Sequence, residues 1–260
     1  MHVCKSERPE PENGFTLIEL SIVIVIIGLI VAGVVGGQSL VEQAKLRNIV
    51  SDFNKFSIAT SAFKIEYGEN AGDLSKAEQY FGTTDCPNFV GVGYTCRCNG
   101  NGNKRVGPES ITGEVHERMR FWQHLALASV LEGNFDGGCD YRYTGTEAIG
   151  RTIPAGSFPA TAYTIMDRNN TNGTDIHLGK RHVEASSFVT IYNAGFINAP
   201  TAQSLDSKID DGIANTGKVR GLDSPNTGSP TGTGNCVDGS DQYILSSIEK
   251  DCYIQYEMLN

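Results

Sequence analysis

The sequence has few charged residues and no stretch in which basic residues cluster. Only 20% of its 260 residues are Asp, Glu, Lys or Arg, and 21 basic side chains stand against 30 acidic ones, giving a net charge of −9. A partner with a phosphate backbone needs clustered Lys and Arg, so no nucleic-acid site is evident. Low charge combined with 30 glycines also excludes long charged helices as the main architecture.

Catalytic and phosphate-binding motifs are missing as well. The sequence contains no GxSxG, no HExxH and no phosphate-binding loop. His116 and His124 lie eight positions apart and share a helical face only loosely. Each of the five histidines is therefore expected to be a surface or partly packed side chain. These absences predict a protein that is not an enzyme and requires no cofactor.

One long apolar run stands near the N-terminus. Between Phe15 and Gly37 the only ionisable side chain is Glu19, and the next charge is Glu42. A run of this length meets the ~20 residues that a helix needs to span a bilayer, and it is longer than a secretory signal core of about 7–15 residues. We expect a retained single-pass segment over 15–37, with Glu19 as a functional carboxylate inside it.

The residues at the start of this run carry a recognisable motif. Gly-Phe-Thr-Leu-Ile-Glu at 14–19 resembles the prepilin signature of type IV pilins and type II secretion pseudopilins. The resemblance implies that a prepilin peptidase removes the leader 1–14 by cutting after Gly14, and that Phe15 becomes the methylated N-terminus. Glu19 matches the family's acidic residue, and its expected partner in a filament is the Phe15 amine of a neighbouring subunit.

The same resemblance implies partners and a location. Its partners would be copies of itself or other pilins in a helical filament, the prepilin peptidase and an inner-membrane assembly platform. The chain would lie in the inner membrane with a periplasmic headpiece before it enters a pilus or a periplasmic filament. Three functions stay open at this point: a major or minor pilin, a type II secretion pseudopilin, or a membrane-anchored periplasmic binding module.

Hydrophobic periodicity continues beyond the apolar run. Ile49, Phe53, Phe56, Ala59 and Phe63 follow a 3.6-residue period with charged residues between them, which predicts an amphipathic helix. The whole N-terminal stalk helix is predicted over 15–67, ending before a glycine at 68. Its amphipathic half is expected to pack on the globular headpiece, residues 68–260.

The headpiece is predicted to be α+β. Helical spacing over 114–132 indicates a second helix, and a further helix is expected over 200–212, with Pro200 at its first position and Gly212 at its end. Strands are expected at 162–166, 187–192 and 253–256, separated by turns such as 169–173. An antiparallel sheet laid against the second half of the stalk helix is the natural arrangement, as in pilins.

Cysteine counting agrees with removal of the leader. Seven cysteines stand in the full sequence, and removing 1–14 takes away Cys4 and leaves an even set. Six cysteines allow 15 pairings, so connectivity does not follow from spacing. The resemblance to pilins favours Cys236–Cys252 as a bridge that closes a C-terminal loop. The others are expected to pair among themselves, with a zinc site as the alternative: Cys86, Cys96, Cys98 and Cys139.

Acidic residues gather where the helix over 200–212 ends. Asp210 and Asp211 fall at the negative end of its dipole, where anions are unfavourable, so a positive charge is expected nearby. Lys208, Lys218 or Arg220 would supply it. The alternative is a bound Ca²⁺ held by Asp206, Asp210 and Asp211 with loop carbonyls.

Overall fold

The computed structural model describes residues 15–86, 89–91, 94–107, 117–138, 148–167, 174–182, 191–224 and 234–258. They divide into two compact units, with the boundary between Ala44 and Lys45 inside the longest helix. The expected turn at 169–173 and most of the expected strand at 187–192 lie outside the described residues.

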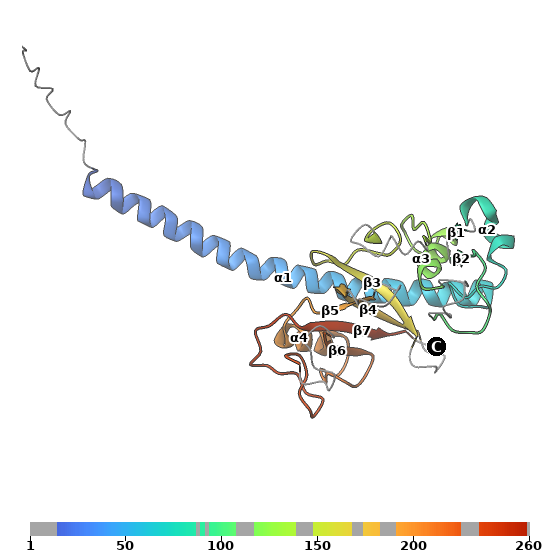
Figure 1. Cartoon of the computed structure of the whole chain (residues 1–260). Coiled ribbons are helices and arrows are strands. Elements are labelled where there is room, and N and C mark those ends of the chain that lie inside the picture. Colours follow the sequence, from blue (N-terminus) through green and yellow to red (C-terminus); the bar gives the residue numbers. More distant parts are fainter. Residues whose placement is uncertain are drawn as a thin grey trace, which may run out of the picture. The chain divides into compact units, whose positions relative to one another are not determined.

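The longest helix is α1, Leu17–Tyr67 (Figure 1). It ends where predicted, because Gly68 takes a left-handed conformation (φ 76°) and donates its N–H to Lys64 O. The predicted stripe of its second half is buried, and Leu46 belongs to it as well. This half of α1 is therefore a core element of the unit that begins at Lys45.

A five-stranded antiparallel sheet packs on that half of α1. The strands run in the order β3-β4-β7-β6, and β5 pairs with the later part of β4. Their bounds are β3 Thr161–Asp167, β4 Thr174–His182, β5 Ile191–Ala194, β6 Val219–Asp223 and β7 Cys252–Glu257. Phe53 of α1 stacks on Tyr256 of β7, with ring centroids 4.6 Å apart, and Phe56 meets Tyr163 of β3 edge-on at 4.9 Å.

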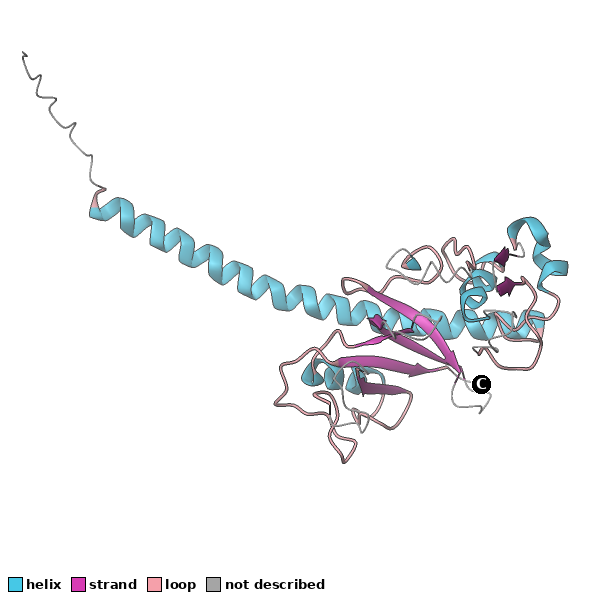
Figure 2. Cartoon of the chain, viewed as in Figure 1, coloured by secondary structure: helices cyan, strands magenta, loops and turns pink. Residues whose placement is uncertain are grey.

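The described part of the headpiece also contains three further helices and a short pair of strands (Figure 2). They are α2 Ala77–Asp85, α3 Glu117–Leu127, α4 Ala199–Ile209 and the antiparallel pair β1 Phe89–Gly91 and β2 Tyr94–Cys96. Near the C-terminal end of α1, Trp122 of α3 meets Phe56, and Phe63 lies close to Phe81 of α2. The α+β architecture with a sheet on the second half of α1 is confirmed.

Several predicted boundaries change. The helix expected over 114–132 is shorter, because Ser129 takes a positive φ of 58° and Val130 and Leu131 donate back to Leu125 O. In α4 the N-cap is Asn198, whose Oδ1 accepts the N–H of Thr201, so Pro200 is the second helical residue and not the first. The helix ends at Ile209, before Gly212.

Candidate functional site

The first turn of α1 contains Glu19 in a capping box. Thr16 is the N-cap residue: its Oγ1 accepts the Glu19 N–H (3.3 Å), while Glu19 Oε2 accepts both the Thr16 N–H and the Thr16 hydroxyl, each at 2.8 Å. The carboxylate is therefore satisfied within its own helix. The sequence analysis missed this role, although the spacing of a threonine and a glutamate three residues later is its signal.

The first half of α1 exposes nearly all of its apolar surface. Large hydrophobic side chains from Phe15 to Val41 are between 50% and 91% exposed, with Phe15 the highest. The helix is long and apolar enough to cross a membrane by length and composition. Gly14 and the rest of 1–14 lie outside the described residues. An apolar surface of this extent needs a cover, either lipid or other helices.

Two disulfides lie in the described part of the headpiece. Cys86 is bonded to Cys98, and Cys236 is bonded to Cys252. The second is the pair that the resemblance favoured. The zinc alternative is overturned for Cys86 and Cys98, because sulfurs bonded to each other cannot be thiolate ligands. The Cys96 side chain and Cys139 lie outside the described residues.

His124 lies beside the Cys86–Cys98 disulfide, and the expectation that it is a surface or partly packed side chain is wrong. Its side chain is fully buried, not at the surface, and burial lowers its pKa to about 3. Nδ1 accepts the N–H of Gly72 (3.0 Å), so the proton is on Nε2, which faces Cys98 O at 3.0 Å. Both ring nitrogens are thus used inside the fold. This neutral histidine joins α3 to the loops around it and is not free to bind a metal.

Two buried carboxylates that were not predicted from the sequence, Asp73 and Glu117, accept backbone hydrogen bonds from the loop 101–107. Asp73 accepts the N–H groups of Asn103 and Lys104, at 3.1 and 2.7 Å. Glu117 accepts those of Asn101 and Gly107, at 3.2 and 3.4 Å. Asp73 and Glu117 also share a hydrogen bond, which requires one proton between them, and burial raises the pKa of Asp73 to about 6. No spacing in the sequence brings positions 73 and 117 together, because a disulfide-closed loop separates them.

The structure gathers Asp206, Asp210 and Asp211 at the end of α4. One carboxylate oxygen of each lies within 4.8 Å of the others, a spacing that a Ca²⁺ ion with oxygen ligands at 2.3–2.6 Å can bridge. Asp206 is fully buried and bonds Tyr243 Oη (2.8 Å) and the Gly212 N–H. Burial, together with the two nearby acids, raises its pKa to about 6.

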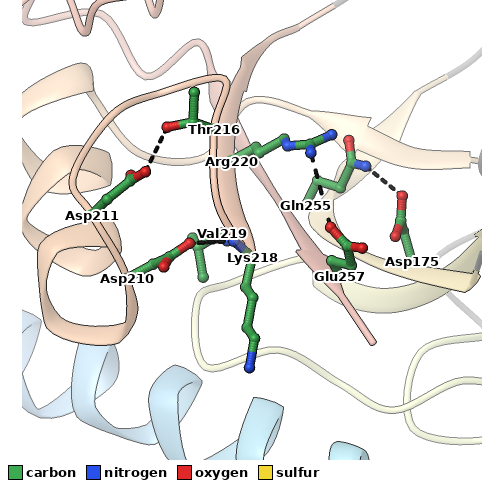
Figure 3. A network of polar contacts seen from close by, with 9 residues as sticks. All are labelled: Asp175, Asp210, Asp211, Thr216, Lys218, Val219, Arg220, Gln255 and Glu257. Atoms are coloured by element: carbon green, nitrogen blue, oxygen red, sulfur yellow. Dashed lines mark hydrogen bonds and ion pairs between the residues drawn. The ribbon is translucent and has the colours of Figure 1, made fainter. Parts of the chain in front are cut away.

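The expected compensation by lysine or arginine side chains takes a different form. Asp210 accepts the backbone N–H groups of Lys218 and Val219, and Asp211 accepts the Thr216 hydroxyl (Figure 3). Arg220 lies 3.9 Å from Glu257 across the β6–β7 pair. Backbone N–H groups and hydroxyl groups therefore stabilise these acids in place of lysine or arginine side chains.

The comparisons with known proteins bear on the first part of the chain. Residues 11–35 match the family model described as the prokaryotic N-terminal methylation motif. No curated protein and no solved structure matches the chain significantly. The match covers the capping box and most of the exposed apolar helix described above. The chain thus carries the leader signature of type IV pilins and pseudopilins.

Proposed function

We propose that the chain is a structural subunit, a major or minor pilin, of a type IV pilus-like filament. The observation that carries this proposal is the combination of a methylation motif with an apolar helix half that is exposed along its length. Lipid would cover that surface before assembly, and the helices of other subunits would cover it afterwards. A type II secretion pseudopilin uses the same device and is the alternative.

The location follows from the same proposal. The chain would wait in the inner membrane with its headpiece in the periplasm, where disulfides such as Cys86–Cys98 and Cys236–Cys252 persist. After the peptidase cuts behind Gly14, the assembly platform would move it into a pilus or periplasmic filament. The headpiece has its own apolar core, so the helix half before Lys45 is available for assembly.

Glu19 would change partner during assembly. In the single chain it caps its own helix through Thr16. In a filament its carboxylate would pair with the methylated Phe15 amine of a neighbour, which fixes the register between subunits and neutralises both charges. An unpaired charge among packed apolar helices costs several kcal/mol, so the pair would decide whether subunits enter.

The test compares Glu19→Ala with Thr16→Val. Glu19→Ala should lower the filament fraction at least about tenfold and leave the membrane pool unchanged or larger, because the neighbour's amine loses its partner. Thr16→Val removes the hydroxyl that caps the helix and keeps the Glu19 carboxylate. It should therefore lower the stability of the helix by ~1 kcal/mol, the cost of a lost cap. Immunoblots of sheared filaments and membranes give both quantities.

Normal filament incorporation of Glu19→Ala would contradict the assembly role. Equal losses in Glu19→Ala and Thr16→Val would assign Glu19 to helix capping alone. Imaging of purified filaments, with mass spectrometry of their main component, separates a pilus from a secretion machine and a major subunit from a minor one.

A further inference from the structure

The C-terminal loop closed by the Cys236–Cys252 disulfide exposes two large aliphatic side chains. Leu245 is 55% exposed and Ile248 is 82% exposed, three residues apart. The loop that carries them is acidic in sequence: it contains Asp238, Asp241, Glu249 and Asp251 against Lys250 as its only base. We call residues 236–252 the acidic loop. It exposes two neighbouring apolar side chains in a negatively charged segment. Exposed apolar surface of this kind is unfavourable in water and indicates a binding partner.

The acidic loop is held firmly from beneath. Besides the disulfide, the Tyr243 hydroxyl donates to buried Asp206 of α4 at 2.8 Å, and Ile244 N–H donates to Cys236 O at 2.9 Å. Asp223 of β6 accepts the Cys236 N–H at 2.8 Å. A turn with a bond from Ser247 N–H to Ile244 O then presents Leu245 and Ile248. Such a loop loses little conformational entropy when it binds.

A second surface of the headpiece has the complementary character. Between Lys45 and Tyr67, α1 carries four bases and two acids, and one of the acids, Asp52, is bonded to the Tyr163 hydroxyl at 2.8 Å. The side opposite the buried stripe exposes Ile58 (70%) and Ile65 (86%), two turns apart. We call the exposed surface of this half of α1 the basic face; its members are Arg47, Lys55, Ile58, Lys64 and Ile65. Glu66 is the one exposed acid of this half, and Lys55 lies 4.0 Å from Glu132, so Arg47 and Lys64 carry most of its positive charge.

A cavity lies at one end of the basic face. This cavity of about 210 Å³ opens beside Lys64 and Ile65, and Phe121 and Met258, both almost fully buried, contribute to its lining. The other lining residues, Thr60, Ser61, Asn70 and Thr174, are polar, so the apolar part of the cavity consists of Ile65, Phe121 and Met258. That apolar part beside a lysine suits an aliphatic side chain that is followed by an acid. Ile248 and Glu249 form such a pair.

We propose that the acidic loop of one subunit docks on the basic face of a second copy of this chain, with Ile248 at the cavity and Glu249 near Lys64. This inference rests on the proposed filament function and specifies one of its subunit contacts. The two surfaces differ, so the contact is heterologous, the class of contact from which open helical filaments are built. A few aliphatic side chains bury far less than the roughly 1,200 Å² of a stable interface, so the contact acts only between subunits already held by their helices.

The experiment uses the full chain in cells that assemble filaments. Ile248→Asp should lower the filament fraction about tenfold while the membrane pool stays constant, and Ile65→Asp should do the same. Glu249→Lys and Lys64→Glu should each lower it several-fold, and the double exchange should restore it to within about twofold. The matched controls are Ile248→Leu and Lys76→Glu, the latter an exposed base outside the basic face.

Each other outcome overturns the proposal in a defined way. Normal filaments from Ile248→Asp exclude the acidic loop as a contact, and normal filaments from Ile65→Asp exclude the basic face. Single charge reversals that the double exchange does not rescue show that the two surfaces meet other partners. Glu19→Ala, measured in parallel, keeps the two proposals apart: if it blocks assembly while Ile248→Asp does not, the filament function stands and this contact fails.

Discussion

Single buried ionisable residues give the headpiece opposing responses to pH. Burial raises the pKa of Asp73 to about 6 from its ordinary value of 3.8, so the folded chain retains a proton that the unfolded chain releases between those two pH values. Stability from this group is therefore present below pH 3.8 and declines as pH rises to about 6. His124 and His177 act the other way: their pKa values fall to about 3 from 6.5, so their contribution is lost as pH falls through that window.

Asp73→Asn isolates the carboxyl pair from the histidines. The free energy of unfolding of the fragment Lys45–Asn260 should be lower in the variant at pH 4, because an amide cannot accept both the Asn103 and Lys104 N–H groups. Relative to wild type, the variant should then gain up to about 1.4 kcal/mol per pH unit between pH 4 and 6, since only wild type must ionise a buried carboxyl group at position 73.

Urea unfolding at pH 4, 5, 6 and 7 measures this difference. His124 and His177 are present in both proteins, so their titration cancels in the comparison. A stability difference that stays constant over this range would show that burial does not raise the pKa of Asp73.

At the scale of elements, the acidic loop, α4 and β6 form one linked assembly. Asp206 of α4 bonds Tyr243 of the acidic loop, and Asp210 after α4 bonds the start of β6 through Lys218 and Val219 N–H. The carboxylates of Asp206, Asp210 and Asp211 face one another in this assembly. An ion bound there would stabilise all three elements at once.

We propose Ca²⁺ as that optional occupant. Millimolar Ca²⁺ should raise the Tm of the fragment Lys45–Asn260 over its value in EDTA, by about 2–4 °C for each kcal/mol of binding free energy. Asp210→Asn should abolish the rise, whereas Asp238→Asn, an exposed acid outside the cluster, should keep it. Identical melting curves with and without Ca²⁺ would refute the proposal.

Periodic elements were predictable from the sequence, and elements defined by tertiary pairing were not. The buried stripe of α1 and the strands β3 and β7 follow hydrophobic patterns. The sequence analysis missed β4, the strand that pairs with β3, β5 and β7, because buried Asp175 and His177 interrupt its apolar residues. β6 was not predicted either, because Arg220 and Gly221 interrupt its apolar residues. Only the surrounding sheet makes such residues part of a strand.

The candidate site divides in the same way. Glu19 and its motif were predicted because they are local in sequence. The hydrogen bonds between Glu19 and Thr16 were also predictable, because the capping-box spacing lies within the same four residues. The Asp73–Glu117 pair and the burial of His124 depend on how distant loops meet. No pattern in a single sequence specifies such contacts between distant loops.

For the whole molecule, processing and oxidation can be checked on one sample. The mature chain should begin at methylated Phe15 and contain three disulfides, because removing 1–14 removes Cys4 and leaves six cysteines. Intact-mass analysis should show loss of the leader with one added methyl group, and alkylation under denaturing, non-reducing conditions should label almost no thiols. A bulky residue in place of Gly14 should block cutting and serves as the unprocessed control.

A retained leader in the wild-type mass would refute the processing prediction. Two labelled thiols would show that Cys96 and Cys139 stay reduced in the mature chain.

The Cys86–Cys98 bond has a consequence for how the protein matures. It closes a loop of 12 residues, and Cys96 offers a rival loop only two residues shorter. Loop-closure entropy varies so slowly with length that it separates the two by only about 0.2 kcal/mol. Diffusive encounter in the unfolded chain therefore produces both bonds at similar rates. What selects Cys98 is the contact of its carbonyl with His124 and the burial of both sulfurs, which exist only after α3 has docked. Correct oxidation therefore follows folding of the headpiece, and an early Cys86–Cys96 bond has to be reshuffled by thiol–disulfide exchange before the Cys86–Cys98 bond can form.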